Sequence, residues 1–264
     1  MSRGRKTLRD EVVTERVVMP EEAGDRPLEQ KVEKIRTRQK SYVMDLRIHS
    51  PASLGYLGIE GIDTAPALVR LARVKGLDMI ALTDYSSGAF IDRVREAAKD
   101  SSVTVIPGFV IRCALPNCND VILSCLFPED FGTREIEGVL EALGIPRSAF
   151  GDRKHIVKIP SEEILSTIES KGGIALPSRM DKTPYRLSVL PTLVEQYGFR
   201  AFDLAYADSV KFFKTRWPKV KFHLFSFSNA NALAQVGSRI AKLKMQDPGF
   251  AGIRAIIARQ ALGS

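Results

Sequence analysis

The sequence predicts an α/β fold, and within that class it favours a closed or nearly closed barrel over an open sheet. From Val43 onward, apolar strands alternate with amphipathic helices, a pattern typical of parallel β/α units. About seven such units can be counted, without internal repeats or low-complexity segments. An open doubly wound sheet of this size would carry a glycine-rich phosphate turn after its first strand, and neither GxGxxG nor GxxxxGK occurs there.

Local signals set the ends of the predicted elements. Asp63 offers an N-cap and Pro66 an early proline to a helix that Gly76 stops. Ser161 is predicted to cap a later helix, and Gly172-Gly173 turns the chain into the next strand. The predicted strands cover residues 43–48, 77–83, 103–107, 121–126, 174–176, 201–204 and 222–225, and the predicted helices cover residues 63–75, 89–99, 135–143, 161–171, 189–197, 209–216 and 250–262.

The chain is predicted to divide into a charged N-terminal extension, residues 1–41, and a barrel domain, residues 42–264. The extension has too few apolar residues for a core, so we expect it to be flexible or partly helical over Leu28 to Arg38. The whole chain has a net charge of +8 at pH 7, and this charge is spread along it. A solvated surface of mixed charge is therefore favoured over a nucleic-acid footprint, which needs a clustered basic patch.

Composition predicts a soluble cytoplasmic protein without membrane contact. The 44% hydrophobic and 27% charged content is ordinary for a globular domain. No run approaches about 18 apolar residues, and the first residues, Met-Ser-Arg-Gly-Arg-Lys, lead into no apolar segment. Cys113, Cys118 and Cys125 lack CxxC spacing, so buried reduced thiols are favoured over a zinc site or a disulfide.

The first predicted strand runs into the polar turn His49-Ser-Pro51, at the strand end where α/β proteins usually hold their chemistry. The segment Asp45-Leu-Arg-Ile-His-Ser50 resembles the DLHxHS signature of the PHP (polymerase and histidinol phosphatase) family. The resemblance covers about Tyr42 to Leu262, and other family motifs follow in the family's order. They are Lys75-Gly-Leu-Asp-Met-Ile-Ala-Leu-Thr-Asp-Tyr85 (KGLDxIAxTDH), Pro107-Gly-Phe-Val110 (PGxE), Gly173-Ile-Ala-Leu-Pro-Ser-Arg179 (GGIAxPAH) and Phe227-Ser-Asn-Ala-Asn231 (SDAH).

Within this family, the chain most resembles the PHP domains at the front of certain ATPase-like proteins. That resemblance rests on Leu126-Phe-Pro128, on Leu143-Gly-Ile-Pro146 and on the stretch Gly237-Ser-Arg-Ile-Ala-Lys-Leu-Lys-Met245. The chain itself contains no Walker motif.

The resemblance implies a distorted, TIM-like (β/α)7 barrel whose histidines and carboxylates hold several metal ions that hydrolyse phosphoesters. Carried over position by position, most of these ligands are replaced here. Valine donates no electron pair, and a protonated arginine repels cations. We therefore expect a pseudoenzyme without a metal cofactor, in which His49 is the retained ligand and Asp120 a second, residual metal candidate. The replaced positions are Arg47, Gly55, Tyr85, Val110, Arg179, Asn229 and Asn231.

Three functions remain open at this point. Fixed guanidinium charge could take the place of the metal ions and bind a phosphate-bearing ligand, a nucleotide or RNA, without hydrolysing it. The barrel could instead be a scaffold that binds a protein partner. A third interpretation is a metal-dependent phosphoesterase with a reduced site at His49, Asp84 and Asp120, or with Tyr85 and His49 as acid and base. The anion-binding candidates are Arg47, His49, Tyr85, Arg179, Asn229 and Asn231, with Arg112, Lys182 and Arg239 at the rim.

Overall fold

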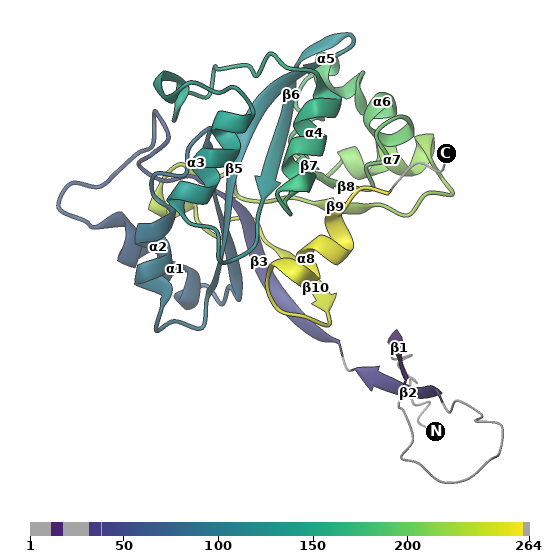
Figure 1. The fold of residues 1–264 in the computed structure, drawn as a ribbon, viewed down its shortest axis with the longest axis horizontal. Coiled ribbons are helices and arrows are strands. Elements are labelled where there is room, and N and C mark those ends of the chain that lie inside the picture. The colour runs from purple at the N-terminus through teal and green to yellow at the C-terminus, as the bar shows by residue number, and fades with distance from the viewer. Residues whose placement is uncertain (1–11, 18–31, 38, 261–264) are drawn as a thin grey trace, which may run out of the picture.

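The computed structural model describes residues 12–17, 32–37 and 39–260, and its centre is a six-stranded sheet with helices along its outer face (Figure 1). The strand order is β10-β3-β4-β5-β6-β7. Strands β3, β4 and β5 are parallel, β6 is antiparallel to both neighbours, and β10 is antiparallel to β3. The strands of this sheet are β3 (Lys40–Ile48), β4 (Met79–Tyr85), β5 (Thr104–Leu115), β6 (Cys118–Leu126), β7 (Ile174–Pro177) and β10 (Ala241–Met245).

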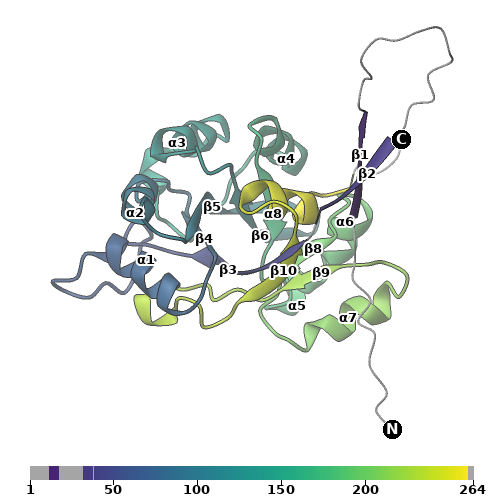
Figure 2. The same ribbon diagram turned by 90° about the horizontal axis from the view of Figure 1, so that it is seen from below.

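A second, parallel pair of strands, β8 (Ala201–Asp203) and β9 (His223–Phe225), continues the sheet around a shared interior (Figure 2). One bridge joins Ser178 to Asp203, and another joins Ile48 to Ala230. These bridges bring the two sheets together at the ends of β7 and β3. The predicted α/β architecture is confirmed in this curled form, while a complete barrel of seven β/α units remains a prediction.

Strands β5 and β6 depart from the predicted alternation because a tight turn joins them. Strand β5 ends at Leu115 and β6 begins at Cys118, with Asn117 in the left-handed region at φ +70°. Parallel neighbours need a crossover of about a dozen residues or more, so this short connection makes an antiparallel hairpin. The prediction of uniformly parallel strands was therefore wrong here, and β5 runs well past the predicted end at Pro107.

Most helices begin and end within two residues of the predicted bounds, but the last one ends at Ile257 and not near Leu262, and the short helix Pro184–Leu187 was not predicted. The Asp63 side chain caps α1 by accepting a hydrogen bond from the Ala65 amide at 3.2 Å, and Gly76 follows the helix with φ +70°. Ser161 was predicted to cap α4, but it is the first helical residue, and its hydroxyl lies 2.7 Å from that of Tyr197. The helices are α1 (Thr64–Val74), α2 (Ile91–Ala98), α3 (Thr133–Ala142), α4 (Ser161–Ser170), α5 (Pro184–Leu187), α6 (Leu190–Glu195), α7 (Ser209–Arg216) and α8 (Phe250–Ile257), with 3₁₀ turns at Arg147–Ala149 and Leu233–Gln235.

The apolar core has two layers, one on each face of the sheet. In β4, Ile80 and Leu82 pack in the outer layer under the helices, while Met79 and Ala81 point into the inner layer. Ile253 of α8 belongs to this inner layer, so α8 covers the interior of the curled sheet. Both faces of the parallel strands are buried, which explains their continuous apolar sequences.

Within the first 39 residues, the structure describes two strands, β1 (Val12–Val17) and β2 (Val32–Thr37), which pair antiparallel, and β3 already begins at Lys40, inside the predicted extension. Residues 32–37 are thus a strand, where a partial helix over Leu28 to Arg38 was expected. The remainder of that stretch lies outside the described residues. Among the described residues, no helix has both the length and the apolar character needed to cross a bilayer.

Candidate functional site

The end of β3 holds a deeply buried guanidinium, that of Arg47. A register shift between Asp45 and Ile48 interrupts the pairing of β3 with β4, as a β-bulge does when it re-aims side chains. The Arg47 side chain is 1% exposed, and its Nε donates to Asn229 Oδ1 at 2.7 Å. Its Nη1 lies 3.4 Å from a carboxylate oxygen of Asp203. Its Nη2 has no hydrogen-bond partner in the part of the chain that the structure describes.

Asp203 is the counter-charge of Arg47, and the sequence analysis did not single it out. It ends β8 and is fully buried, and its Oδ1 accepts a hydrogen bond from the Phe227 amide at 3.0 Å. Burial raises the pKa of Asp203, and the nearby Arg47 charge partly opposes this. The available signal was a carboxylate at the end of the apolar strand Ala201-Phe-Asp203, because strand ends on such scaffolds carry functional groups.

His49 lies against Tyr85, and both side chains were predicted to line the site. Their rings stack with 4.8 Å between centroids and 12° between planes. The His49 Nε2 is 3.5 Å from Asn229 Oδ1, while Nδ1 is buried without a hydrogen-bond partner among the described residues. Burial, together with the Arg47 charge, lowers the pKa of His49 to about 3. The imidazole is therefore neutral at physiological pH, and it adds no positive charge to the site.

Arg179 brings a second guanidinium toward Arg47. Its backbone is in the left-handed region at φ +53°, as is that of Asn229 at φ +51°. The Arg179 amide donates to the Asp203 backbone oxygen at 2.6 Å, which fixes the residue beside β8. Burial is the main cause that lowers the pKa of Arg179, and the positive charges of Arg47 and Arg239 add to it. The guanidiniums therefore lie close enough to repel one another.

Arg239 and Lys182 were predicted at the rim, and Asn231 was predicted in the lining. Arg239 donates through Nη1 to the Ala205 carbonyl at 2.8 Å, so its side chain is anchored beside the end of β8. Lys182 is exposed on the turn after Arg179. The backbone amide of Asn231 donates to the side-chain oxygen of Gln235 at 2.9 Å.

Arg112 and Asp120, two further candidates, bind each other. Arg112 Nη2 lies 2.6 Å from Asp120 Oδ1, and Arg186 donates to Asp120 Oδ2 through both Nε, at 2.9 Å, and Nη2, at 2.7 Å. Asp120 is thus held between two guanidiniums across the β5–β6 hairpin. Asp120 supplies one negative charge to two guanidiniums, so the charge of Arg112 is only partly compensated, and its rim role stays a prediction.

No protein-family model matches the chain, and no curated protein is significantly similar to it in sequence. Endonuclease Q from Pyrococcus furiosus superimposes with a TM-score of 0.57 at 16% identity over 82% of this chain, and endonuclease Q bound to a 27-mer duplex with an abasic lesion gives 0.54 at 15% identity over 81% of it. A metal-dependent phosphoesterase from Bifidobacterium adolescentis gives 0.51 at 13% identity, with 81% of this chain and 94% of that one covered. An amidohydrolase from Chromobacterium violaceum, solved with bound sulfate and no metal, gives 0.54 at 14% identity, with 82% and 97% covered.

The chain has a PHP-like fold. This is the fold type that the sequence motifs predicted, and at these identities the likeness concerns the fold alone. The chain spans 56% of the length of endonuclease Q, so the larger protein contains a substantial part with no counterpart here. The ATPase-linked branch suggested by the sequence stays a prediction.

The residues of this PHP-like chain do not fit the metal ions that the fold family implies. Asp84 accepts hydrogen bonds from the Ser50 amide at 2.7 Å and from the Ser50 and Ser53 hydroxyls at 2.6 Å each, so most of its roughly four lone-pair positions are already used. Asp120 is held by two guanidiniums, and Arg47 places a fixed positive charge beside His49. Within residues 39–260, no three His, Cys, Asp or Glu side chains converge as metal ligands. The reduced site of His49, Asp84 and Asp120 is thus poorly suited to a divalent ion, because its carboxylates are engaged by other donors and a fixed positive charge lies beside its histidine.

Proposed function

We propose that this chain is a catalytically inactive PHP-like protein that binds a phosphate-bearing ligand at Arg47 and Arg179. The observation that carries the proposal is Arg47 Nη2, which is buried and has no hydrogen-bond partner among the residues that the structure describes. Leaving a buried charged donor unsatisfied costs about 1–3 kcal/mol or more. An anion that accepts from this nitrogen would recover that cost.

The balance of charge around Arg47 supports an anionic ligand. The charges that act on Arg179 are the guanidiniums of Arg47 and Arg239 and the carboxylates of Asp203 and Asp181. With Arg179 itself, three positive groups thus face two negative ones. Asp181 is further occupied, because both of its oxygens accept backbone amides, at 2.7 and 2.9 Å. A phosphate accepting from the guanidiniums would replace their mutual repulsion with charge-assisted hydrogen bonds.

The exposed fraction of the three arginines decreases from Arg239 through Arg179 to Arg47. This order favours a ligand that enters the site with one end first. Arg47 is almost fully buried, Arg179 is half-buried and Arg239 is exposed, so the positive groups lead inward from the surface. Such an arrangement suits a terminal phosphate, as on a nucleotide or an RNA end. In support, an amidohydrolase of the same fold type was solved with sulfate, and endonuclease Q was solved on duplex DNA.

The same residues explain why binding would not lead to hydrolysis. Metal-assisted phosphoester cleavage requires cations that acidify a water molecule, and the ligands for those cations are replaced. His49 would be a weak base, because burial and the Arg47 charge lower its pKa to about 3 and the opposing hydrogen bond with Asn229 does not offset them. Ligand capture without turnover is the function that the described geometry supports best.

Calorimetric titration tests this proposal. Sulfate, phosphate, mononucleotides and short RNA oligomers with and without a 5′-phosphate are titrated into the native chain and into Arg47→Met/Arg179→Met. Loss of two charge-assisted contacts, at about 1.5–3 kcal/mol each, predicts a fall in affinity of at least a hundredfold. The matched control is Arg134→Met/Lys211→Met, which removes two exposed charges from α3 and α7. Equal affinities in the two double variants, or no binding by the native chain, would overturn the proposal.

A further inference from the structure

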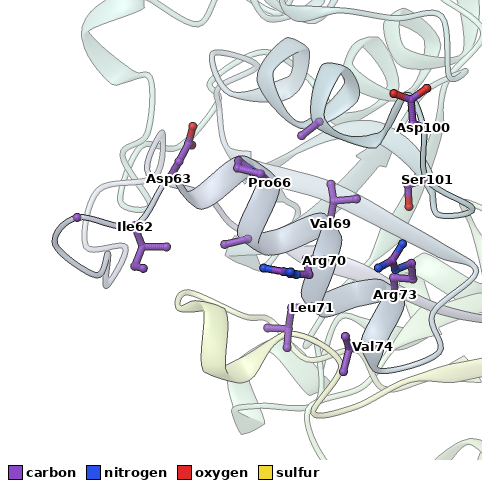
Figure 3. A pocket seen from close by; sticks show the side chains of 13 residues that line it. Ile62, Asp63, Pro66, Val69, Arg70, Leu71, Arg73, Val74, Asp100 and Ser101 are labelled. Atoms are coloured by element: carbon purple, nitrogen blue, oxygen red, sulfur yellow. The ribbon is translucent and has the colours of Figure 1, made fainter.

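A surface groove on the outer side of the fold, between α1 and the end of α2, is independent of the candidate anion site. It has a volume of about 750 Å³, within the range of about 300–1,000 Å³ typical of ligand pockets. It shares no lining residue with the cluster around Arg47. Figure 3 shows the side chains that line it, most of which project from α1.

The floor and edge of this groove are apolar and partly exposed. Val69 is buried at its base, Pro66 lies beside it, and Leu71 is half-buried. Val74 is 76% exposed and Ile62 is 47% exposed, at the two ends of α1. Single exposed apolar residues are common, but several that line one groove are typical of an interaction surface.

The charges at the groove are mainly positive and uncompensated. Arg70 and Arg73 are exposed at positions i and i+3 of α1, so they lie on the same side of the helix. Neither forms an ion pair with any described residue. Asp63, in contrast, is already engaged, because it caps α1 and binds Arg93 Nη2 at 3.0 Å. Asp100 is the one acidic lining residue left without an ion pair among those described.

The apolar surface extends beyond the groove along the loop that precedes α1. Leu54, Leu57 and Ile59 are 66%, 61% and 55% exposed on this loop. The loop is held in place by backbone hydrogen bonds, from Leu54 to Gly151 and from Leu57 to Asn231. The fixed loop ends at Gly61 and Ile62, which line the edge of the groove.

From these observations we propose that the α1 groove docks an amphipathic, acidic segment of a partner protein. Its apolar side chains would cover Val69, Leu71 and Val74, and its carboxylates would pair with Arg70 and Arg73. Arg70 and Arg73, at positions i and i+3 of α1, match acidic residues that are spaced by one turn of a partner helix. A nucleic acid is a poorer match, because two arginines supply few phosphate contacts and the groove floor is apolar.

A peptide selection tests the proposal. A library of random peptides displayed on phage is selected in parallel on the native chain and on Arg70→Glu/Arg73→Glu. Peptides recovered with the native chain alone are expected to combine Leu, Ile or Phe with Asp or Glu, and to lose at least tenfold in affinity on the variant, measured by fluorescence anisotropy. Replacing their acidic residues by Lys should restore binding to the reversed-charge variant.

Two further pairs of variants separate the groove from general effects. Ile62→Ser/Val74→Ser should weaken the selected peptides at least tenfold, while Tyr206→Ser/Ile240→Ser, which alters equally exposed apolar residues elsewhere, should leave affinity unchanged. Arg134→Glu/Lys211→Glu reproduces the change in net charge at a distance and should also have no effect.

Several results would overturn the proposal. They are recovery of the same peptides on the native chain and on Arg70→Glu/Arg73→Glu, recovery of basic peptides, or recovery of none. A concentration-dependent dimer in light scattering that Val74→Glu abolishes would assign the groove to a second copy of this chain. Binding of single-stranded RNA that Arg70→Glu/Arg73→Glu abolishes would assign it to nucleic acid.

Discussion

Arg47 and Asp203 form an ion pair across the curled sheet, with 3.4 Å between Nη1 and Oδ2 and side chains that are 1% and 0% exposed. The two residues are 156 positions apart in the chain. At this depth, neither charge is solvated, so each depends on the other for compensation. The separation is long for an ion pair, and Nη2 has no partner within residues 39–260, so the charge of Arg47 is incompletely compensated there.

Replacing the acidic member of this pair is expected to destabilise the protein strongly. Asp203→Asn keeps an oxygen for the Phe227 amide but leaves Arg47 buried without a counter-charge, which costs about 3–5 kcal/mol. In Arg47→Met/Asp203→Asn the buried charge is gone as well, so the double variant should be more stable than Asp203→Asn alone. Urea unfolding of the two single variants and the double variant measures the coupling. Strictly additive effects would contradict the interpretation of a dependent pair.

Arg179 is expected to lower the free energy of unfolding of the native chain, although it contributes to anion binding. Arg179→Gly removes a side chain from a left-handed backbone position, at a gain of about 1 kcal/mol, and also removes repulsion from Arg47 and Arg239. The variant should therefore unfold at a higher urea concentration, yet lose the stabilisation that sulfate gives to the native chain. That stabilisation amounts to about 2.7 kcal/mol when sulfate is at a hundred times its dissociation constant. Lys182→Gly, on the exposed turn nearby, is the control and should not be stabilised; an unchanged response of Arg179→Gly to sulfate would rule out its role in binding.

The pH dependence of stability is expected to report on His49. Its pKa is about 3 in the folded protein and about 6.5 when unfolded, so the unfolded state binds more protons between these values. Stability from this residue is full above pH 6.5 and is lost as pH falls toward 3, by up to an order of 5 kcal/mol. Asp45, whose pKa burial raises to about 6, acts in the opposite direction between about pH 4 and 6. The comparison is therefore made between the native chain and His49→Gln, in urea titrations from pH 4 to 8, where the variant should lose less stability on acidification. Parallel curves would show that His49 is protonated as easily folded as unfolded.

Divalent metal ions are expected to neither stabilise the protein nor support catalysis. Arg47 repels cations beside His49, and the oxygens of Asp84 and Asp120 are already bound to donors. Manganese or zinc is added at 100 µM, about the dissociation constant of a weak but specific cation site in a protein. The unfolding temperature should not change. Elemental analysis and a bis(p-nitrophenyl) phosphate assay complete the measurement. Stoichiometric metal together with turnover that His49→Ala abolishes would establish a phosphoesterase instead.

The sequence was sufficient for features that neighbouring residues decide. Asp63 and Gly76 delimit α1 as predicted, because caps and stops act within a single turn. The order of the motifs predicted the PHP-like fold, and it placed Arg47 and His49 at the end of β3. The β5–β6 hairpin was missed because Leu77 to Pro107 had set an expectation of parallel strands, although Asn117 carried a turn signal.

Taken alone, the sequence determined the α/β class and most element positions, since each depends on residue types and short-range periodicity. That Arg47 and Arg179 stand in place of histidines is implied by the resemblance and stays a prediction. The tertiary structure decided which groups meet. Strand order, and the bridge from Ser178 to Asp203, place an unpredicted carboxylate beside Arg47, while Asp120 turns away to Arg112. Such pairings depend on the strand register and the sheet curvature, which the whole core sets. Neither can be predicted from residues that are neighbours in the sequence.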